Sequence, residues 1–144
     1  MKARPRSVER KVAEHLTAFF IPQGYSEVER IPVLGRTGPD VSINEFGLVV
    51  DVKSRLEVPK CYMTPAIHGD LYCSHLDGIN FDVPASSARS VLVERWFDHM
   101  HEWTLAKYKT GITALVLHRP GMPIGKSILV IKDLKEFEKR WKQQ

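Results

Sequence analysis

Hydrophobic and polar positions alternate along this chain with two different periods, and these periods predict its elements. Between residues 7 and 20 apolar side chains recur every three to four positions, which predicts a helix capped by Ser7. A similar pattern predicts a long helix over 87–111 that ends at Gly111 and a short one over 133–141 capped by Asp133. Alternating or continuous apolar runs predict strands at 25–33, 40–44, 47–54, 112–118 and 127–131. This order, αβββ followed by αββα, predicts an α/β fold with a mixed sheet flanked by helices.

The pattern breaks down between residues 56 and 87. Pro59, Pro65, Pro84, Gly69 and Gly78 interrupt it repeatedly. We therefore expect an irregular insertion or a long lid within one domain that covers residues 1–144.

The composition says more about the cellular location of the protein than about its function. The chain has 144 residues, of which 43% are hydrophobic, so it can build a core without disulfide staples. Two cysteines are too few for a disulfide framework, and we see no membrane-spanning run or signal peptide. We expect a cytoplasmic protein of a bacterium or a phage-infected cell, without a membrane partner. The net charge of +4 permits a phosphate-rich partner without requiring one.

Residues 40–53 predict a hairpin that carries charge in an apolar setting. A four-residue turn at 44–47 pairs position 42 with 49 and position 40 with 51. Asp40 then faces Asp51, and Lys53 shares the face of Asp51 because side chains alternate along a strand. Apolar side chains at 48, 50 and 52 point to the other face, into the core.

Two ionised carboxylates opposite each other would repel unless a cation compensates them. Lys53 supplies one positive charge, and Mg²⁺, which typically takes one or two carboxylates, would supply more. The alternative is that Asp40 caps the end of a loop and that Asp51 and Lys53 form an exposed ion pair.

At Pro39-Asp40 and Asp51-Val52-Lys53 the sequence resembles the PD-(D/E)XK nuclease superfamily. Within it, the chain is most similar to small Holliday-junction-resolvase-like endonucleases, including phage versions. The resemblance covers residues 7–55 and 88–143. It implies a restriction-endonuclease-like αβββαβ core and a deoxyribonuclease that depends on Mg²⁺ or Mn²⁺.

Glu9 extends the resemblance to the first helix. Those resolvases open with a glutamate in an E-R-x-x-x-x-x-L setting, which Glu9, Arg10 and Leu16 reproduce. Helical spacing places Glu9 on the apolar face of residues 12, 13, 16 and 20, so its carboxylate points inward. The alternative is that Glu9 only complements the helix dipole in the first turn.

The resemblance also implies a role for each residue of the candidate site. Asp40 and Asp51 would hold the metal ion, while Glu9 would orient the attacking water or complete a second metal site. Lys53 would position or deprotonate that water and stabilise the transition state. The family often has a polar residue, frequently Gln, on the helix after the third strand; here Glu102 or His101 stands in that region.

DNA is the expected partner, bound through phosphate contacts that carry little sequence information. Candidate contacts are Lys2, Arg4, Arg6, Arg36, Thr37 and Arg55, with a solvated basic surface as the alternative. No separate reading motif is visible, which favours recognition of branched DNA by a homodimer, as in DNA recombination. Alternative functions are a restriction or repair nickase, an exonuclease, and an inactive nuclease fold that only binds DNA or protein.

The segment 56–87 contains Cys61, His68, Cys73 and His75, which could in principle hold Zn²⁺. Their spacing matches no common zinc site, so we expect half-buried thiols instead. Tyr62, Tyr72 and Phe81 in this segment could stack on unpaired bases, but we expect them to pack within the protein. On the long helix we expect Trp96 and Trp103 to be core or dimer contacts.

Overall fold

The computed structural model describes residues 5–25, 29–30, 41–43, 46–59, 62–80, 82–87, 90–107 and 112–142. Within these ranges eight strands form one mixed sheet, in the order β1-β2-β3-β7-β8-β5-β4-β6. The strands are β1 (Glu29–Arg30), β2 (Val41–Ile43), β3 (Leu48–Ser54), β4 (Ile67–His68), β5 (Leu71–His75), β6 (Ala85–Ser86), β7 (Ile112–His118) and β8 (Ile128–Lys132). The helices are α1 (Pro5–Phe20), α2 (Val91–Lys107) and α3 (Leu134–Lys142), with short 3₁₀ turns η1 (Ile21–Gln23) and η3 (Ile124–Lys126).

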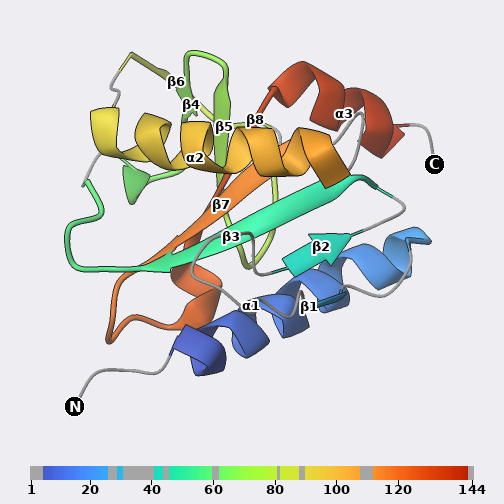
Figure 1. The fold of residues 1–144 in the computed structure, drawn as a ribbon, viewed down its shortest axis with the longest axis horizontal. Coiled ribbons are helices and arrows are strands. Elements are labelled where there is room, and N and C mark those ends of the chain that lie inside the picture. Colours follow the sequence, from blue (N-terminus) through green and yellow to red (C-terminus); the bar gives the residue numbers. More distant parts are fainter. Residues whose placement is uncertain are drawn as a thin grey trace.

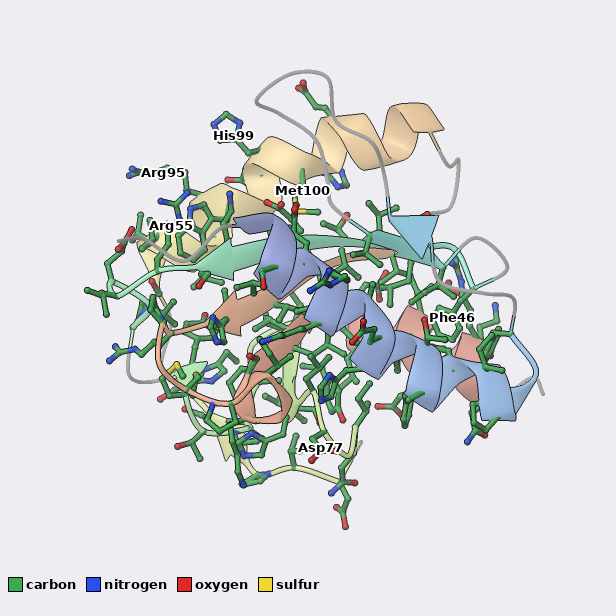
Figure 2. All side chains as sticks on the ribbon, turned by 90° about the horizontal axis from the view of Figure 1, so that it is seen from below. Phe46, Arg55, Asp77, Arg95, His99 and Met100 are labelled. Atoms are coloured by element: carbon green, nitrogen blue, oxygen red, sulfur yellow. The ribbon has the colours of Figure 1, made fainter. Side chains whose placement is uncertain are left out.

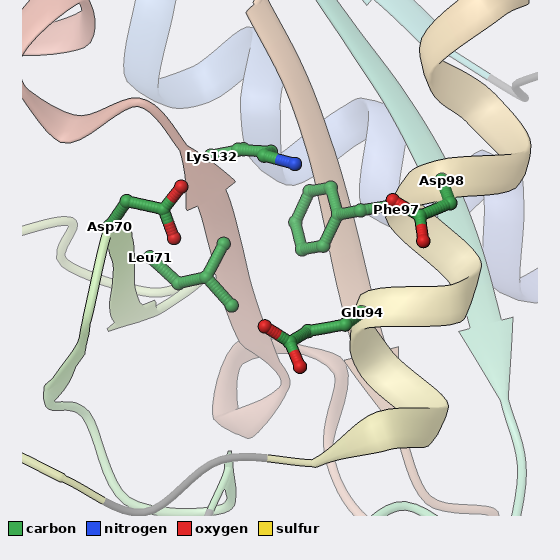
Figure 3. A pocket seen from close by; sticks show the side chains of 6 residues that line it. All are labelled: Asp70, Leu71, Glu94, Phe97, Asp98 and Lys132. Atoms are coloured by element: carbon green, nitrogen blue, oxygen red, sulfur yellow. The ribbon is translucent and has the colours of Figure 1, made fainter.

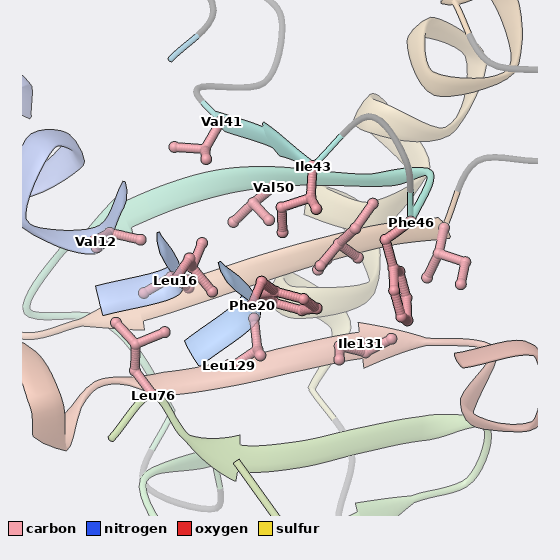
Figure 4. Close-up of a cluster of buried hydrophobic side chains, with 14 of the residues drawn as sticks. Val12, Leu16, Phe20, Val41, Ile43, Phe46, Val50, Leu76, Leu129 and Ile131 are labelled. Atoms are coloured by element: carbon pink, nitrogen blue, oxygen red, sulfur yellow. The ribbon is translucent and has the colours of Figure 1, made fainter. Parts of the chain in front are cut away.

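Helices α1 and α2 cover opposite faces of the sheet (Figure 1). On the α1 face, Val12, Leu16 and Phe20 pack against Val50 of β3 and Leu129 of β8 (Figure 4). Helix α2 covers the other face with four apolar side chains, those of Val93, Trp96, Phe97 and Met100. They pack on apolar side chains of three strands: Val49, Leu115, Leu117, Ile128 and Val130. Both faces of β3, β7 and β8 are therefore buried, which explains why their sequences read as continuous apolar runs. The predicted α/β class, with a mixed sheet flanked by helices, is confirmed.

The hairpin register agrees with the prediction wherever it is described. Strands β2 and β3 are antiparallel, with Ser42 opposite Val49 and Val41 opposite Val50. Strand β3 then runs parallel to β7, with Asp51 opposite Leu115 and a crossover that contains α2. At the turn, the Arg140 side chain of α3 donates to the Phe46 carbonyl at 2.9 Å and so fixes the start of β3.

Near the N-terminus, the predicted helix cap is wrong, and the predicted strand at 25–33 lies partly outside the described residues. Helix α1 begins at Pro5, so Ser7 is inside the helix and does not cap it. The proline ring presets the helical φ and lacks an N–H, which suits the first helical turn. Of the predicted strand at 25–33, only Glu29–Arg30 is described as a strand, and Tyr25 precedes it in irregular backbone.

The segment 56–87, predicted to be an irregular insertion or a long lid, is irregular only in part. This segment supplies β4, β5 and β6, and β5 pairs with β8 along its whole length. Gly69 was interpreted as a breaker, but Gly69 and Asp70 form a two-residue hairpin loop in which His68 pairs with Leu71. The positive φ of Gly69, 67°, is the conformation that such a loop needs at its first position.

The helices begin within four residues of their predicted starts. Helix α2 starts at Val91, with the N–H of Val93 3.4 Å from the Ser90 hydroxyl, and residue 111 lies outside the described ranges. The predicted cap of the final helix is confirmed, because the N–H of Glu136 donates to Asp133 Oδ1 at 3.3 Å. In the described parts of the chain, none of the helices has both the length and the apolar content that crossing a membrane requires.

Candidate functional site

The charged pair on β3 lies under α2, in mostly apolar surroundings. Lys53 Nζ is 3.1 Å from Asp51 Oδ2, and the two side chains are 21% and 12% exposed. Leu115 and Leu117 of β7 stand opposite them in the register. The alternative of a freely exposed ion pair therefore does not fit, because most of each side chain is shielded from solvent. Burying this pair costs solvation free energy, which the ion pair offsets only in part.

Trp96 of α2 lies against the same charges. The Lys53 ammonium is 5.7 Å and the Arg55 guanidinium 6.0 Å from the centre of the indole ring. Arg55 also makes a long, exposed ion pair of 3.7 Å with Glu57. Asp51 and Lys53 at the end of β3 thus lie close to Arg55 and to the Trp96 ring of α2.

Hydrogen bonds fix the backbone at this end of β3. The N–H of Arg55 donates to the carbonyl of His118 at 2.9 Å. Ser54 Oγ lies 2.8 Å from His118 Nδ1, and His118 Nε2 lies 3.0 Å from the carbonyl of Met122. Because a carbonyl only accepts, His118 Nε2 is the donor to the Met122 carbonyl. These bonds join the ends of the two parallel strands, where ligands commonly bind in open α/β sheets.

The predicted site residues divide into three groups. Asp51, Lys53 and Arg55 are brought together as described above. Asp40, predicted to face Asp51, is outside the described residues. Also outside are Arg4, Arg36 and Thr37, as well as the side chain of Arg6.

Glu9 is not brought to Asp51. Its helix packs on the face of β3 that carries Leu48 and Val50, whereas Asp51 shares the opposite face with Val49. Glu9 is half-buried on α1, and its predicted inward-facing neighbours at 12, 13, 16 and 20 are all buried. Among the described residues there is no group of three or more His, Cys, Asp or Glu side chains placed to hold a metal ion.

The other described residues considered in the sequence analysis lie away from the charged pair on β3 or are buried in the core. His101 and Glu102 are both exposed on α2, and His101 lines a pocket with Thr113 and Arg140. Cys73 is fully buried in the hydrophobic cluster under α2, and Cys61 lies outside the described residues. Tyr62 and Tyr72 are also fully buried, so they pack within the protein and present no face to a base.

Sequence reasoning missed Trp96 as a neighbour of the charged strand, and it missed the polar residues Arg95 and His99 beside Trp96 on α2. Arg95 and His99 are exposed on α2, and Figure 2 shows them on the same side of the molecule as Arg55. Their spacing of four residues, on the flank next to Trp96, was a usable signal.

A pocket of about 380 Å³ lies on the other flank of α2 (Figure 3). Its lining combines carboxylates of Asp70, Glu94 and Asp98 with Lys132 and the apolar Leu71 and Phe97. Neither Asp51 nor Lys53 lines it. The pocket is thus separate from the strand that carries the motif.

Comparisons with protein-family models, with curated proteins and with solved structures found no match. The functional interpretation therefore depends on the motif and on the geometry around β3.

Proposed function

We propose that this protein is a metal-dependent nuclease of the PD-(D/E)XK type that hydrolyses phosphodiester bonds in DNA. The observation that carries the proposal is the Asp51–Lys53 pair, 3.1 Å apart under α2, on the strand that follows β2 in an antiparallel hairpin. A charged pair that is mostly buried at the end of two parallel strands is costly to keep for stability alone.

The order of elements supports the same proposal. Omitting β4–β6, the chain reads α1-β1-β2-β3-α2-β7, which is the αβββαβ order of the restriction-endonuclease-like core. Strands β4–β6 then extend the sheet beyond β8, away from the motif strand.

The donor chemistry near β3 fits a hard divalent cation. Asp51 would hold Mg²⁺ or Mn²⁺ together with Asp40, since such ions typically take one or two carboxylates and complete their coordination with water and substrate oxygens. The ion would polarise the scissile phosphate and make its water more acidic. Lys53, as an ammonium held at Asp51, is suited to stabilising the negative charge that develops on the phosphate.

Substitution of Asp51 tests the proposal. We expect Asp51→Asn to lower cleavage by at least about 10²-fold, since it removes a metal-binding carboxylate, and to leave DNA affinity nearly unchanged. The matched control is Asp98→Asn, which makes the same chemical change on the far flank of α2. Equal cleavage by wild type and Asp51→Asn would refute the site.

Substrate choice is measured with linear duplex, flap, single-stranded and four-way-junction DNA, each with Mg²⁺ and with a chelator. A resolvase-like enzyme acting as a homodimer should prefer the junction and lose activity with the chelator. Equal cleavage of all substrates would instead favour the alternative of a nickase or exonuclease of the same fold.

A second candidate function is DNA or protein binding without catalysis. It is favoured by two observations on the described residues: Glu9 lies on the opposite face from Asp51, and no cluster of three metal-ligating side chains is formed. DNA binding by the wild type without cleavage of any substrate in Mg²⁺ or Mn²⁺ would favour this candidate.

A further inference from the structure

Trp96 occupies an unusual position for a core aromatic residue. It belongs to the hydrophobic cluster under α2 and is only 9% exposed. Yet its ring contacts Lys53 of β3 and Arg55 just after that strand, with Lys53 Nζ at 5.7 Å and the Arg55 guanidinium at 6.0 Å from the ring centre. A Trp face attracts cations more strongly than a Tyr or Phe face does.

The spacing of the two cations explains how one ring can contact both. Positions 53 and 55 lie on the same face of the chain, about 6.6 Å apart along an extended backbone. Lys53 and Arg55 have long, flexible side chains that would otherwise sample many rotamers. Contact with a rigid, buried ring restricts both, and the hydrogen bond from the Arg55 N–H to His118 restricts the backbone beneath them.

We propose that Trp96 is a positioning residue that holds Lys53 beside Asp51 and Arg55 next to it, as two aligned anchors for a nucleic-acid phosphate backbone. Lys53 faces the phosphate that reacts, and Arg55 binds a neighbouring one. This inference rests on the proposed function, and it names the residue on α2 that serves the motif strand. The exposed His101 and Glu102 have no described contact with that strand.

The geometry can be tested without any activity. In the wild type, ring currents from Trp96 should shift the side-chain proton resonances of Lys53 upfield in NMR spectra. The shift should largely persist in Trp96→Phe and disappear in Trp96→Leu, which keeps an apolar side chain but removes the ring. An unshifted Lys53 in the wild type would overturn the inference even if the enzyme cleaves DNA.

The role is tested by the kinetics of the same variants. We expect Trp96→Leu to lower kcat by about tenfold, the equivalent of one partly desolvated cation–π contact, and to raise KM because Arg55 is released. Trp96→Phe should recover most of both losses.

The control for damage to the core is Phe97→Leu. Phe97 belongs to the same helix and cluster but faces the pocket on the other flank. Its replacement should lower thermal stability without changing kcat. A kcat for Trp96→Leu that matches wild type, or one that falls no further than in Phe97→Leu, would overturn the inference. An inactive wild type with an intact ring-current shift would instead count against the proposed function.

Discussion

At the scale of single residues, the sheet buries several polar groups that need compensation. Asp51 obtains it from Lys53, and Ser54 and His118 obtain it from each other. Tyr72 of β5 is fully buried and stacks on Phe137 of α3, with ring centroids 6.3 Å apart. Burial raises the pKa of Tyr72 from 10.0 to about 12, and the polar groups of Ser74 and Asn80 nearby oppose this shift only in part.

The shifted pKa of Tyr72 predicts a loss of stability in alkali. Between pH 10 and about 12 the unfolded chain releases the Tyr72 proton while the folded chain retains it. The unfolded state then binds fewer protons, so the free energy of unfolding falls as pH rises through this window, and below pH 10 Tyr72 contributes no pH dependence.

The measurement is urea unfolding at pH values on both sides of 10, for wild type and Tyr72→Phe. Other groups titrate in both chains, so the decisive quantity is the difference between them. We expect the wild type to lose more stability than the variant above pH 10. Parallel curves would show that Tyr72 titrates normally.

At the scale of elements, the start of α3 depends on an aspartate in a conformation that is rare for residues other than glycine. Asp133 has a φ of 68°, accepts the N–H of Glu136, and donates its own N–H to the Asp70 carbonyl at 3.2 Å. Aspartate tolerates this left-handed region better than most residues because its short side chain bonds locally.

Three substitutions at Asp133 separate the contribution of its side-chain cap from that of its positive φ angle. Asp133→Asn keeps both and should leave stability nearly unchanged, whereas Asp133→Gly loses only the cap, at a cost of a few tenths of a kcal/mol. Asp133→Ala loses the cap and is strained at positive φ, so we expect it to be less stable by about 1–2 kcal/mol. Denaturant unfolding measures all three, and equal stability of the Ala and Asn variants would contradict this account.

Elements with a strong period could be predicted from the sequence, and elements defined by distant pairing could not. The apolar runs at 112–118 and 128–132 and the pairing of Ser42 with Val49 follow from local pattern and turn length. Strand β5 was missed because its partner is β8, more than fifty residues away, and because Gly69 was interpreted as a breaker. A glycine–aspartate pair between two short apolar runs was the available hairpin signal.

The candidate site shows the same division. Alternation along β3 is sufficient to put Asp51 and Lys53 on one face, and the structure has them 3.1 Å apart. The positions of Glu9 and Trp96 depend on which face of the sheet each helix covers. Helical periodicity gives the buried side of a helix but not the face of the sheet on which that side packs.

At the scale of the whole molecule, α2 separates two surfaces of different charge. The flank toward β3 carries Arg95, on the same side of the molecule as Arg55, and the opposite flank carries Glu94 and Asp98 around the pocket (Figures 2 and 3). With a net charge of only +4, such an asymmetry matters more for orienting a polyanion than the total charge does.

This asymmetry predicts which basic residues contribute to the salt dependence of DNA affinity. If Arg95 contacts a phosphate, Arg95→Gln should reduce the slope of log affinity against log salt by about 0.9. Lys139→Gln removes the same charge from an exposed position on α3 and should leave the slope unchanged. Fluorescence anisotropy at several salt concentrations measures both. Equal changes in the two variants would mean that DNA has no preferred side.

The parallel pairing of β3 with β7 also determines when, during synthesis of the chain, the charged strand can pair with its neighbour. Residues 48–54 are translated long before residues 112–118, and α2 also lies between them in the chain. A nascent chain that ends before residue 112 leaves Asp51 and Lys53 on an uncovered strand edge, without Leu115 or Leu117 beside them. Most of the chain must therefore be synthesised before Asp51 and Lys53 can be buried between β7 and α2.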